Sequence, residues 1–147
     1  MTNEKSLKPG RGPLVSIGKG ATVLEAVQAM VQGKVGAAVI QDGTKLLGVF
    51  TERDVVRRVV LPGLDSKTTP VTEVMTKNVI TVREDTDRSS ALKLMNEHYI
   101  RHLPMVDAEG KVLAIISMRQ LLRAEVQDLQ QTVWELVADT AVDSAGG

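Results

Sequence analysis

The sequence contains no cysteine and only two histidines, His98 and His102. The lack of cysteine excludes disulfides, thiolate metal sites and cysteine nucleophiles, and two histidines are too few for a histidine-rich metal cage. Aromatic residues make up 2% of the chain and hydrophobic residues 43%, so the core must be built mainly from aliphatic side chains and Met. The 18 basic residues balance the 18 acidic ones. This balance gives no general surface for a polyanion and argues against nucleic-acid binding.

No apolar run approaches the roughly 18 residues that a membrane span needs, and the first residues, MTNEKSLKPGRGPL, do not resemble a signal peptide. We therefore expect a cytoplasmic protein that does not contact a membrane. No nucleophile–base pair, metal-ligand set or matched carboxylate pair recurs at a useful spacing. We accordingly expect no catalytic residues, no metal site and no enzymatic activity.

The chain contains an internal repeat. A shift of 65 residues superposes the first half on the second, and the shift becomes 66 after one extra residue in the second turn. The matched pairs include Ile17 with Val82, Ala26 with Ala91, Met30 with Met95, Asp42 with Asp107, Thr51 with Ser117 and Arg53 with Arg119. The 147 residues therefore hold two copies of one small unit that share a core.

Each copy predicts the order β-α-β-β-α. A short strand, 14–17 or 78–82, precedes a helix, and two apolar runs flanking a polar turn predict a hairpin. Thr22 and Glu25 form a capping-box pattern, and Pro70 suits the start of a short helix through Met75. The expected divisions are a flexible arm (1–13), the first unit (14–61), a linker with the short helix (62–75), the second unit (76–126) and a C-terminal helix extension with its tail (127–147).

The last helix is longer than its counterpart in the first unit. Its apolar positions alternate spacings of four and three, and Trp134 lies beside them; they are Leu122, Val126, Leu129, Val133 and Leu136. This stripe either packs on its own domain or faces a partner, and two heptads are too few for an autonomous coiled coil. The sequence leaves both interpretations open.

The stretch GVFTERD, residues 48–54, lies where a strand ends and a helix begins. Thr51 and Asp54 can form a capping box that satisfies free backbone N–H groups. Alternatively, Thr51 and Arg53 can donate to a phosphate while Asp54 accepts from the two hydroxyls of a ribose. The second copy, AIISMRQ, keeps the hydroxyl and the Arg but ends in Gln120. Because Ser117 can still cap that helix, the ligand interpretation is favoured for Asp54.

The two units resemble a tandem pair of CBS domains, also called a Bateman module. The stretches VLEAVQAM, VGAAVI, GVFTERD, VMTKNVITV, IRHLP and AIIS occur in the order of that family and cover residues 14–126. The resemblance implies an α+β fold, an α/β-type sandwich in which two CBS repeats pack with pseudo-twofold symmetry in a stand-alone two-repeat protein. It also implies a homodimer and an unidentified regulated protein as partner. The apolar outer helices support the homodimer through Val55, Val56, Val59, Val60, Leu121, Leu122 and Val126.

The resemblance further implies a regulatory module that senses an adenosine-containing ligand between the repeats. AMP and ATP are expected first, with ADP, NAD and S-adenosylmethionine as further members of the class. Thr51 and Arg53 would lie near phosphate and Asp54 on the ribose. The other expected nucleotide-binding residues are Arg101 and His102, near phosphate, and Ser16, Val35, Gly36 and Ala37, beside the base. His102 equally fits a surface position at the start of the hairpin.

A second, weaker site is expected from Thr81, Pro104, Ser117 and Arg119. Gln120 lacks the carboxylate there, and a hydrogen bond to a charged group is worth about 1.5–3 kcal/mol, roughly ten- to a hundredfold in affinity. We therefore expect one competent site and one weak or empty site. The alternative function is a protein–protein interaction scaffold whose nucleotide cleft is vestigial.

Overall fold

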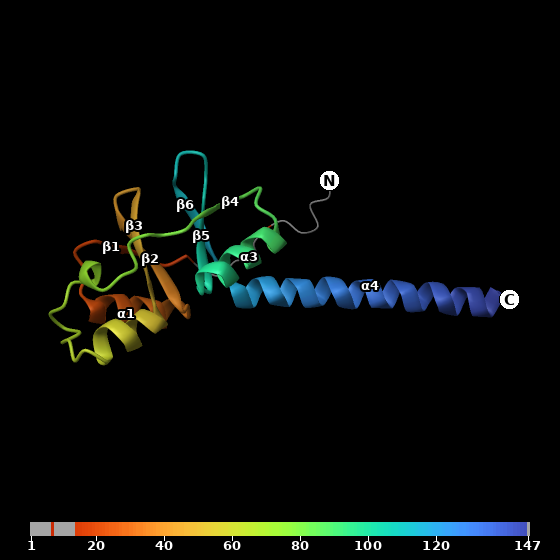
Figure 1. Cartoon of the computed structure of the whole chain (residues 1–147), viewed down its shortest axis with the longest axis horizontal. Coiled ribbons are helices and arrows are strands. Elements are labelled where there is room, and N and C mark those ends of the chain that lie inside the picture. The colour runs from red at the N-terminus through yellow and green to blue at the C-terminus, as the bar shows by residue number, and fades with distance from the viewer. Residues whose placement is uncertain (1–6, 8–13, 147) are drawn as a thin grey trace.

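The protein consists of two three-stranded sheets, one from each half of the chain, with helices packed around them (Figure 1). This computed structural model describes Leu7 and residues 14–146. The strands are β1 (Ser16–Gly18), β2 (Ala37–Asp42) and β3 (Lys45–Thr51) in one sheet, and β4 (Val82–Arg83), β5 (His102–Val106) and β6 (Val112–Ser117) in the other. In each sheet the first strand runs parallel to the second, which forms an antiparallel hairpin with the third. The predicted α+β fold of two repeated units is confirmed.

The helices follow the repeat with local differences. They are α1 (Val23–Gly33), α2 (Glu52–Asp54), the π-helix η2 (Val55–Val60), the 3₁₀-helix η3 (Val71–Glu73), α3 (Arg88–His98) and α4 (Met118–Gly146). The predicted capping box is present at α1, where Thr22 N donates to Glu25 Oε1 at 2.9 Å and Glu25 N donates to Thr22 Oγ1 at 3.2 Å. The short helix is one turn of 3₁₀-helix that ends at Glu73, before the expected Met75.

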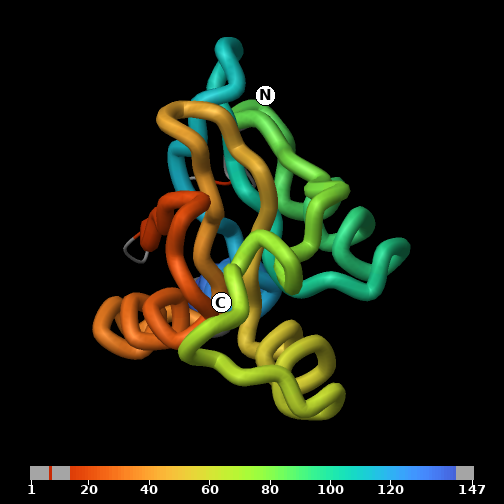
Figure 2. The backbone as a smooth tube through the Cα atoms, turned by 90° about the vertical axis from the view of Figure 1, so that its left-hand side faces the viewer, coloured from red at the N-terminus to blue at the C-terminus, as the bar shows by residue number. Residues whose placement is uncertain are grey.

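The two sheets share one apolar cluster, and each repeat has a cluster of its own. The shared cluster joins Ala37, Val39 and Val49 of the first sheet to Val106 and Val112 of the second. Figure 2 shows the two hairpins beside one another, with α1 and the α2–η2 segment together at one end of the first hairpin. The repeats are therefore packed on each other through their sheets.

One residue of the predicted flexible arm is described. Leu7 is 3% exposed and packs in the core of the second repeat with Val82 and Leu121. The other residues of 1–13 lie outside the described part of the chain. At this one position the arm is held against the folded body, because burial of a Leu side chain is favourable by about 1.5–3 kcal/mol.

The chain that follows the linker, around Thr76, runs beside β3 because Gly48 has no side chain to keep it away. A Cβ at Gly48 would lie 2.6 Å from the carbonyl oxygen of Thr76, too close for any larger residue without a shift of the backbone. Val49 and Thr76 exchange backbone hydrogen bonds of 3.0 and 2.9 Å. This pairing fixes the segment 76–80 beside β3, next to the start of α2.

Helix α4 continues directly from β6 and projects beyond the globular body (Figure 1). Arg88, at the start of α3, is 3% exposed and anchors the helix, with Nη2 at 2.5 Å from Asp128 Oδ2 and Nε at 3.6 Å from Glu125 Oε1. In the described part of the chain, no helix has the length and apolar character needed to span a bilayer.

Candidate functional site

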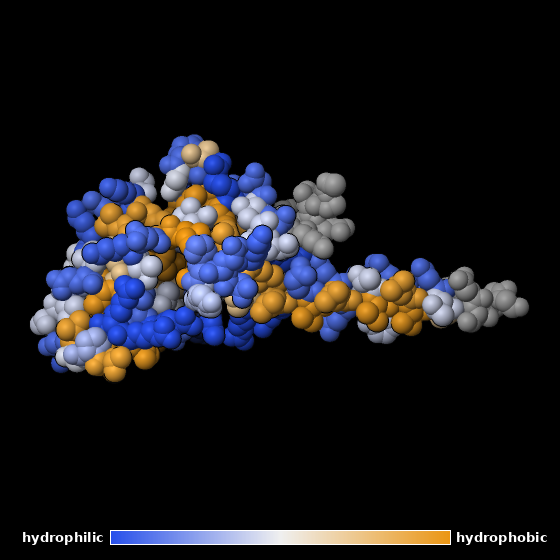
Figure 3. Space-filling model, viewed as in Figure 1, coloured by the Kyte–Doolittle hydropathy of each residue, from blue (hydrophilic) through white to orange (hydrophobic). Residues whose placement is uncertain are grey.

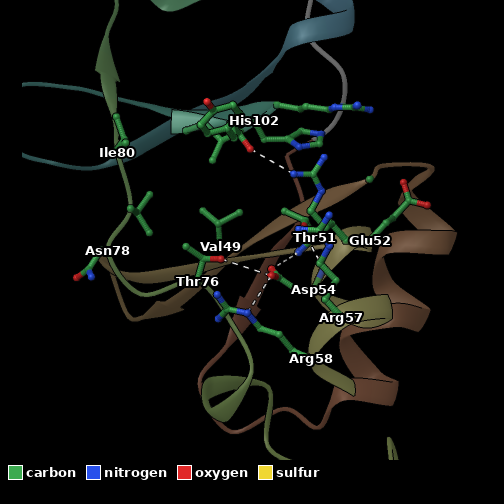
Figure 4. Close-up of a pocket in the computed structure, with 16 residues that line it drawn as sticks. Val49, Thr51, Glu52, Asp54, Arg57, Arg58, Thr76, Asn78, Ile80 and His102 are labelled. Carbon is green, nitrogen blue, oxygen red and sulfur yellow. Dashed lines mark hydrogen bonds and ion pairs between the residues drawn. The ribbon is translucent and has the colours of Figure 1, made fainter. Parts of the chain in front are cut away.

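A cavity of about 360 Å³ lies where the start of α2 in the first repeat faces residues 76–80 and 99–102 of the second (Figure 4). We call it the Asp54 pocket. Its lining residues are Gly36, Val49, Thr51, Glu52, Arg53, Asp54, Arg57, Arg58, Thr76, Asn78, Val79, Ile80, Tyr99, Ile100, Arg101 and His102. Both repeats therefore supply walls of one pocket.

Asp54 is 7% exposed, and its two carboxylate oxygens have different partners. Oδ2 accepts from the backbone N of Thr51 at 3.0 Å, while Asp54 N donates to Thr51 Oγ1 at 3.2 Å. Oδ1 lies 3.5 Å from both Thr76 Oγ1 and Arg58 Nε, both long contacts (Figure 4). One oxygen thus closes the capping box, and the other is weakly engaged and able to accept a stronger hydrogen bond.

The pocket combines a cationic region with an apolar wall. Four guanidinium groups, those of Arg53, Arg57, Arg58 and Arg101, line it together with two carboxylates, those of Glu52 and Asp54. The apolar wall comes from Val79, Ile80 and Ile100 of the second repeat and Val49 of the first. A pocket with these two regions suits a ligand that has a flat apolar part and an anionic part.

Two of the arginines are also tied to the backbone. Arg58 Nη1 donates to the carbonyl oxygen of Met75 at 2.9 Å, and Arg53 Nη1 donates to that of Tyr99 at 3.2 Å. Each guanidinium has five N–H donors, so one such contact orients the group and leaves other donors for a ligand. The arginine side chains are in this way positioned before a ligand arrives.

His102 lies at the boundary between two pockets. Burial lowers the pKa of its imidazole below 6.5, and the nearby cations Arg101 and Arg53 lower it further, while Glu52 opposes the shift. His102 is therefore neutral at pH 7 and can donate one hydrogen bond from one ring nitrogen and accept one at the other. An anion bound beside it would raise this pKa again.

The second cavity, of about 760 Å³, is related to the first by the repeat. We call it the Gln120 pocket. Residues 34–37 of the first repeat, equivalent to 99–102, face the start of α4 in the second. Its lining residues are Lys34, Val35, Gly36, Ala37, Glu52, Arg101, His102, Ile115, Ser117, Met118, Arg119, Gln120, Leu122 and Arg123. The two pockets share Gly36, Glu52, Arg101 and His102.

Gln120 makes the same capping contacts as Asp54. Ser117 N donates to Gln120 Oε1 at 3.2 Å, and Gln120 N donates to Ser117 Oγ at 3.2 Å. The remaining polar atom is an amide nitrogen, which donates hydrogen bonds, where Asp54 has a carboxylate oxygen that accepts them. Both repeats therefore have the same helix cap. They differ in the atom that remains for a ligand, which is a carboxylate oxygen in Asp54 and an amide nitrogen in Gln120.

The structure brings six of the nine predicted nucleotide-binding residues into the Asp54 pocket: Gly36, Thr51, Arg53, Asp54, Arg101 and His102. Val35 and Ala37 instead line the Gln120 pocket, together with Ser117 and Arg119 of the predicted second site. Three residues line neither described pocket: Ser16, whose hydroxyl donates to Gln41 Oε1, the exposed Thr81, and the fully buried Pro104.

Several lining residues were not expected from the sequence: Arg57, Arg58, Thr76, Asn78, Ile80 and Tyr99. The two arginines follow Asp54 by three and four residues, a spacing that places them along the same helix face as the carboxylate. That spacing was a signal in the sequence. Tyr99 has φ 55°, and Lys34 at the equivalent position has φ 57°. No cluster of three or more His, Asp or Glu side chains suited to a metal ion occurs among the described residues.

Comparison with known protein families identifies a family whose model covers most of the chain. The family model for the CBS domain matches residues 10–61 and again 71–127. A CBS domain-containing mitochondrial protein of Arabidopsis thaliana is 35% identical over 122 residues, which are 80% of this chain and 59% of that protein. The chain thus spans less than two thirds of that relative's length.

Solved structures with the same fold include proteins from bacteria and archaea. A protein with CBS domains from Burkholderia ambifaria is 35% identical with a TM-score of 0.76, covering 83% of this chain and 90% of that chain. A CBS domain protein from Pyrobaculum aerophilum complexed with AMP is 29% identical with a TM-score of 0.68, covering 73% of this chain and 82% of that chain.

Proposed function

The chain belongs to the CBS domain family, whose paired domains form regulatory modules, and we propose that its Asp54 pocket binds an adenine nucleotide as the regulatory ligand. The observation that carries the proposal is the position of Asp54 Oδ1. This atom belongs to a buried carboxylate, faces a cavity, and has contacts no shorter than 3.5 Å. A buried carboxylate oxygen gains most from strong donors, and the vicinal hydroxyls of a ribose supply two of them.

The rest of the nucleotide fits the two regions of the pocket. With the ribose at Asp54, the phosphate group meets Thr51, Arg53 and the arginines of η2, and the base meets Val79, Ile80 and Ile100. The excess of four guanidiniums over two carboxylates favours an anionic ligand over adenosine itself. AMP in the Pyrobaculum aerophilum relative supports this ligand class. AMP and ATP are the first candidates, and ADP, NAD and S-adenosylmethionine share the adenosine part.

Binding would regulate by holding the two repeats together. The ribose and phosphate contacts come mainly from the first repeat, whereas the apolar wall and Arg101 come from the second. A ligand that contacts both repeats stabilises the conformation in which the repeats lie close together. The equilibrium between this conformation and a more open one shifts by the difference in the ligand's affinity for the two. A regulated partner would then recognise one arrangement.

Titration calorimetry with AMP, ADP, ATP, NADH and S-adenosylmethionine tests the proposal. We expect measurable binding of at least one phosphorylated ligand, and we expect Asp54→Asn to weaken it by about ten- to a hundredfold. Asn keeps a carbonyl oxygen for the Thr51 cap, so the melting temperature of the free protein should change little.

Asp85→Asn is the matched control, because Asp85 is exposed and lines neither pocket. It should leave binding unchanged. No heat and no thermal shift with all five ligands would overturn the proposal and favour the alternative, a protein–protein scaffold whose cleft binds no nucleotide. Equal binding by Asp54→Asn and the unaltered chain would place the ligand elsewhere.

A further inference from the structure

Helix α4 carries an apolar seam that no other described part of the chain covers. The seam consists of Leu122, Val126, Leu129, Val133 and Leu136, which are between 49% and 63% exposed. Figure 3 shows apolar side chains along the projecting part of the helix, outside the globular body. Most exposed apolar residues need no explanation, but a continuous row of five on one helix indicates an interaction surface.

The seam lies apart from the face that anchors α4 to its own domain. Glu125 and Asp128 contact Arg88, and on a helix with 100° per residue they lie roughly 60–120° away from Leu122. The interpretation that the whole stripe packs on its own domain is therefore excluded for the described residues. The anchored face and the seam can be occupied at the same time.

The residue types along the seam select the occupant. In heptad notation Val126 and Val133 occupy position a, and the three leucines of the seam occupy position d. Among parallel coiled coils, β-branched residues at a with Leu at d favour two strands over three or four. The seam therefore fits a single partner helix of the same pattern, a second α4, and the flanking positions set its direction.

The flanking positions agree with the parallel arrangement. In a parallel pair, position g of one helix lies next to position e of the following heptad in its partner. The pairs are then Glu125 with Gln130 and Thr132 with Val137. Neither pair brings two like charges together. An antiparallel arrangement sets the g positions of both helices against each other. Those include Glu125 and Asp139, two carboxylates, so that arrangement is disfavoured.

The short length of the seam does not prevent pairing here. It spans 14 residue steps from Leu122 to Leu136, about 21 Å, too short for two free peptides to stay helical and paired. In this protein β6, the Ser117 cap and Arg88 already hold the first turns of α4 in the helical conformation. The folded domain therefore supplies the helix nucleus, and pairing does not have to offset the cost of forming it.

From these observations we infer that two copies of the chain associate in parallel through the α4 seam. The two globular bodies then lie at the same end of the coiled coil. This surface differs from the exposed Val56 and Val60 on η2, and it does not depend on whether the Asp54 pocket binds a nucleotide.

Sedimentation equilibrium on the whole chain tests the association. We expect the unaltered chain to have an even number of subunits and Leu129→Glu to halve its mass, because two carboxylates would face each other in one d layer. Gln131→Glu is the matched control, since Gln131 is exposed on the opposite side of the same turn, and it should leave the mass unchanged. A monomeric unaltered chain, or equal masses for Leu129→Glu and the unaltered chain, would overturn the inference.

Disulfide cross-linking tests the orientation, because the chain has no cysteine of its own. In a parallel pair two Leu136 positions face each other, so Leu136→Cys should form a disulfide-linked dimer on mild oxidation. An antiparallel pair would separate these positions by roughly 15 Å along the axis, beyond the reach of a disulfide. Ala138→Cys, on the outer face, measures random cross-linking. Equal yields from the two variants would contradict the parallel arrangement.

Discussion

Arg53 donates a hydrogen bond from Nη1 to the carbonyl oxygen of Tyr99 at 3.2 Å, and this contact joins the two repeats across the Asp54 pocket. Tyr99 ends α3 in a left-handed conformation, with φ 55°. The guanidinium is thereby held against the second repeat, near His102, in the absence of a ligand. The same side chain therefore serves the packing of the repeats and the proposed phosphate contact.

Arg53→Lys should lower the affinity for AMP by about tenfold, because an ammonium group cannot donate in two fixed directions at once. Binding of adenosine, which lacks the phosphate, should change much less. Calorimetry with both ligands separates the two effects. Arg83→Lys, at an exposed position outside both pockets, is the control. Equal losses for AMP and adenosine would show that Arg53 acts only through the packing of the repeats.

Gln120→Glu should increase the affinity of the Gln120 pocket for the same ligand class by about ten- to a hundredfold. Glu at this position keeps the capping box with Ser117 and replaces an amide donor by a carboxylate acceptor. The stoichiometry of binding to the chain should then rise from one towards two in calorimetry. When Gln120→Glu is combined with Asp54→Asn, binding of the ligand in the Gln120 pocket should remain. An unchanged stoichiometry would mean that the carboxylate is not what the second pocket lacks.

Acid conditions should strengthen ligand binding and weaken the free protein, both through His102. Its pKa is lowered below 6.5 by burial, so the unfolded chain binds the proton more readily. The free energy of unfolding should thus fall as the pH drops below about 6.5. A bound phosphate raises the pKa, so binding should take up protons near pH 6, which calorimetry in buffers of different ionisation enthalpy detects. His102→Gln should remove both effects, and persistence of proton uptake in that variant would contradict the assignment.

Asp128→Asn should lower the free energy of unfolding by about 1–2 kcal/mol. Arg88 is buried, and loss of one partner of a buried charge is costly. The full penalty is not expected because Asp128 is half exposed and Glu125 remains beside Arg88. Urea unfolding measures the change, with Asp139→Asn, an exposed carboxylate further along α4, as the control. A change equal to that of the control would show that Arg88 does not need Asp128.

The repeat explains why the fold could be predicted from the sequence. Matched apolar positions such as Met30 and Met95 appear twice, and each copy supports the assignment of the other. The two first strands were placed less well, at 14–17 and 78–82, whereas the structure has Ser16–Gly18 and Val82–Arg83. These strands have only three and two residues, so the alternation of buried side chains is too short to fix their ends.

The composition of the pockets was less accessible from the sequence. Thr51, Arg53 and Asp54 form one local motif, and their shared location follows from the start of α2. Val35 and Ala37 belong to the same repeat as Asp54, yet they line the Gln120 pocket. The pseudo-twofold packing sets the helix start of one repeat against the strand start of the other, so residues near in sequence are divided between the pockets. The sequence of one repeat alone does not indicate which of its residues line the pocket at the other repeat's helix start.

The direct continuity of β6, the Ser117 cap and α4 gives the protein a mechanical property. The first turn of α4 lines the Gln120 pocket, and the helix then continues to Gly146, 29 residues in all, or about 43 Å of rigid rod. A tilt of about 5° at the pocket would displace the far end by about 4 Å. The helix therefore acts as a lever arm that converts a small tilt at the pocket into a displacement of several ångströms, about half of the roughly 8–10 Å between the axes of packed helices.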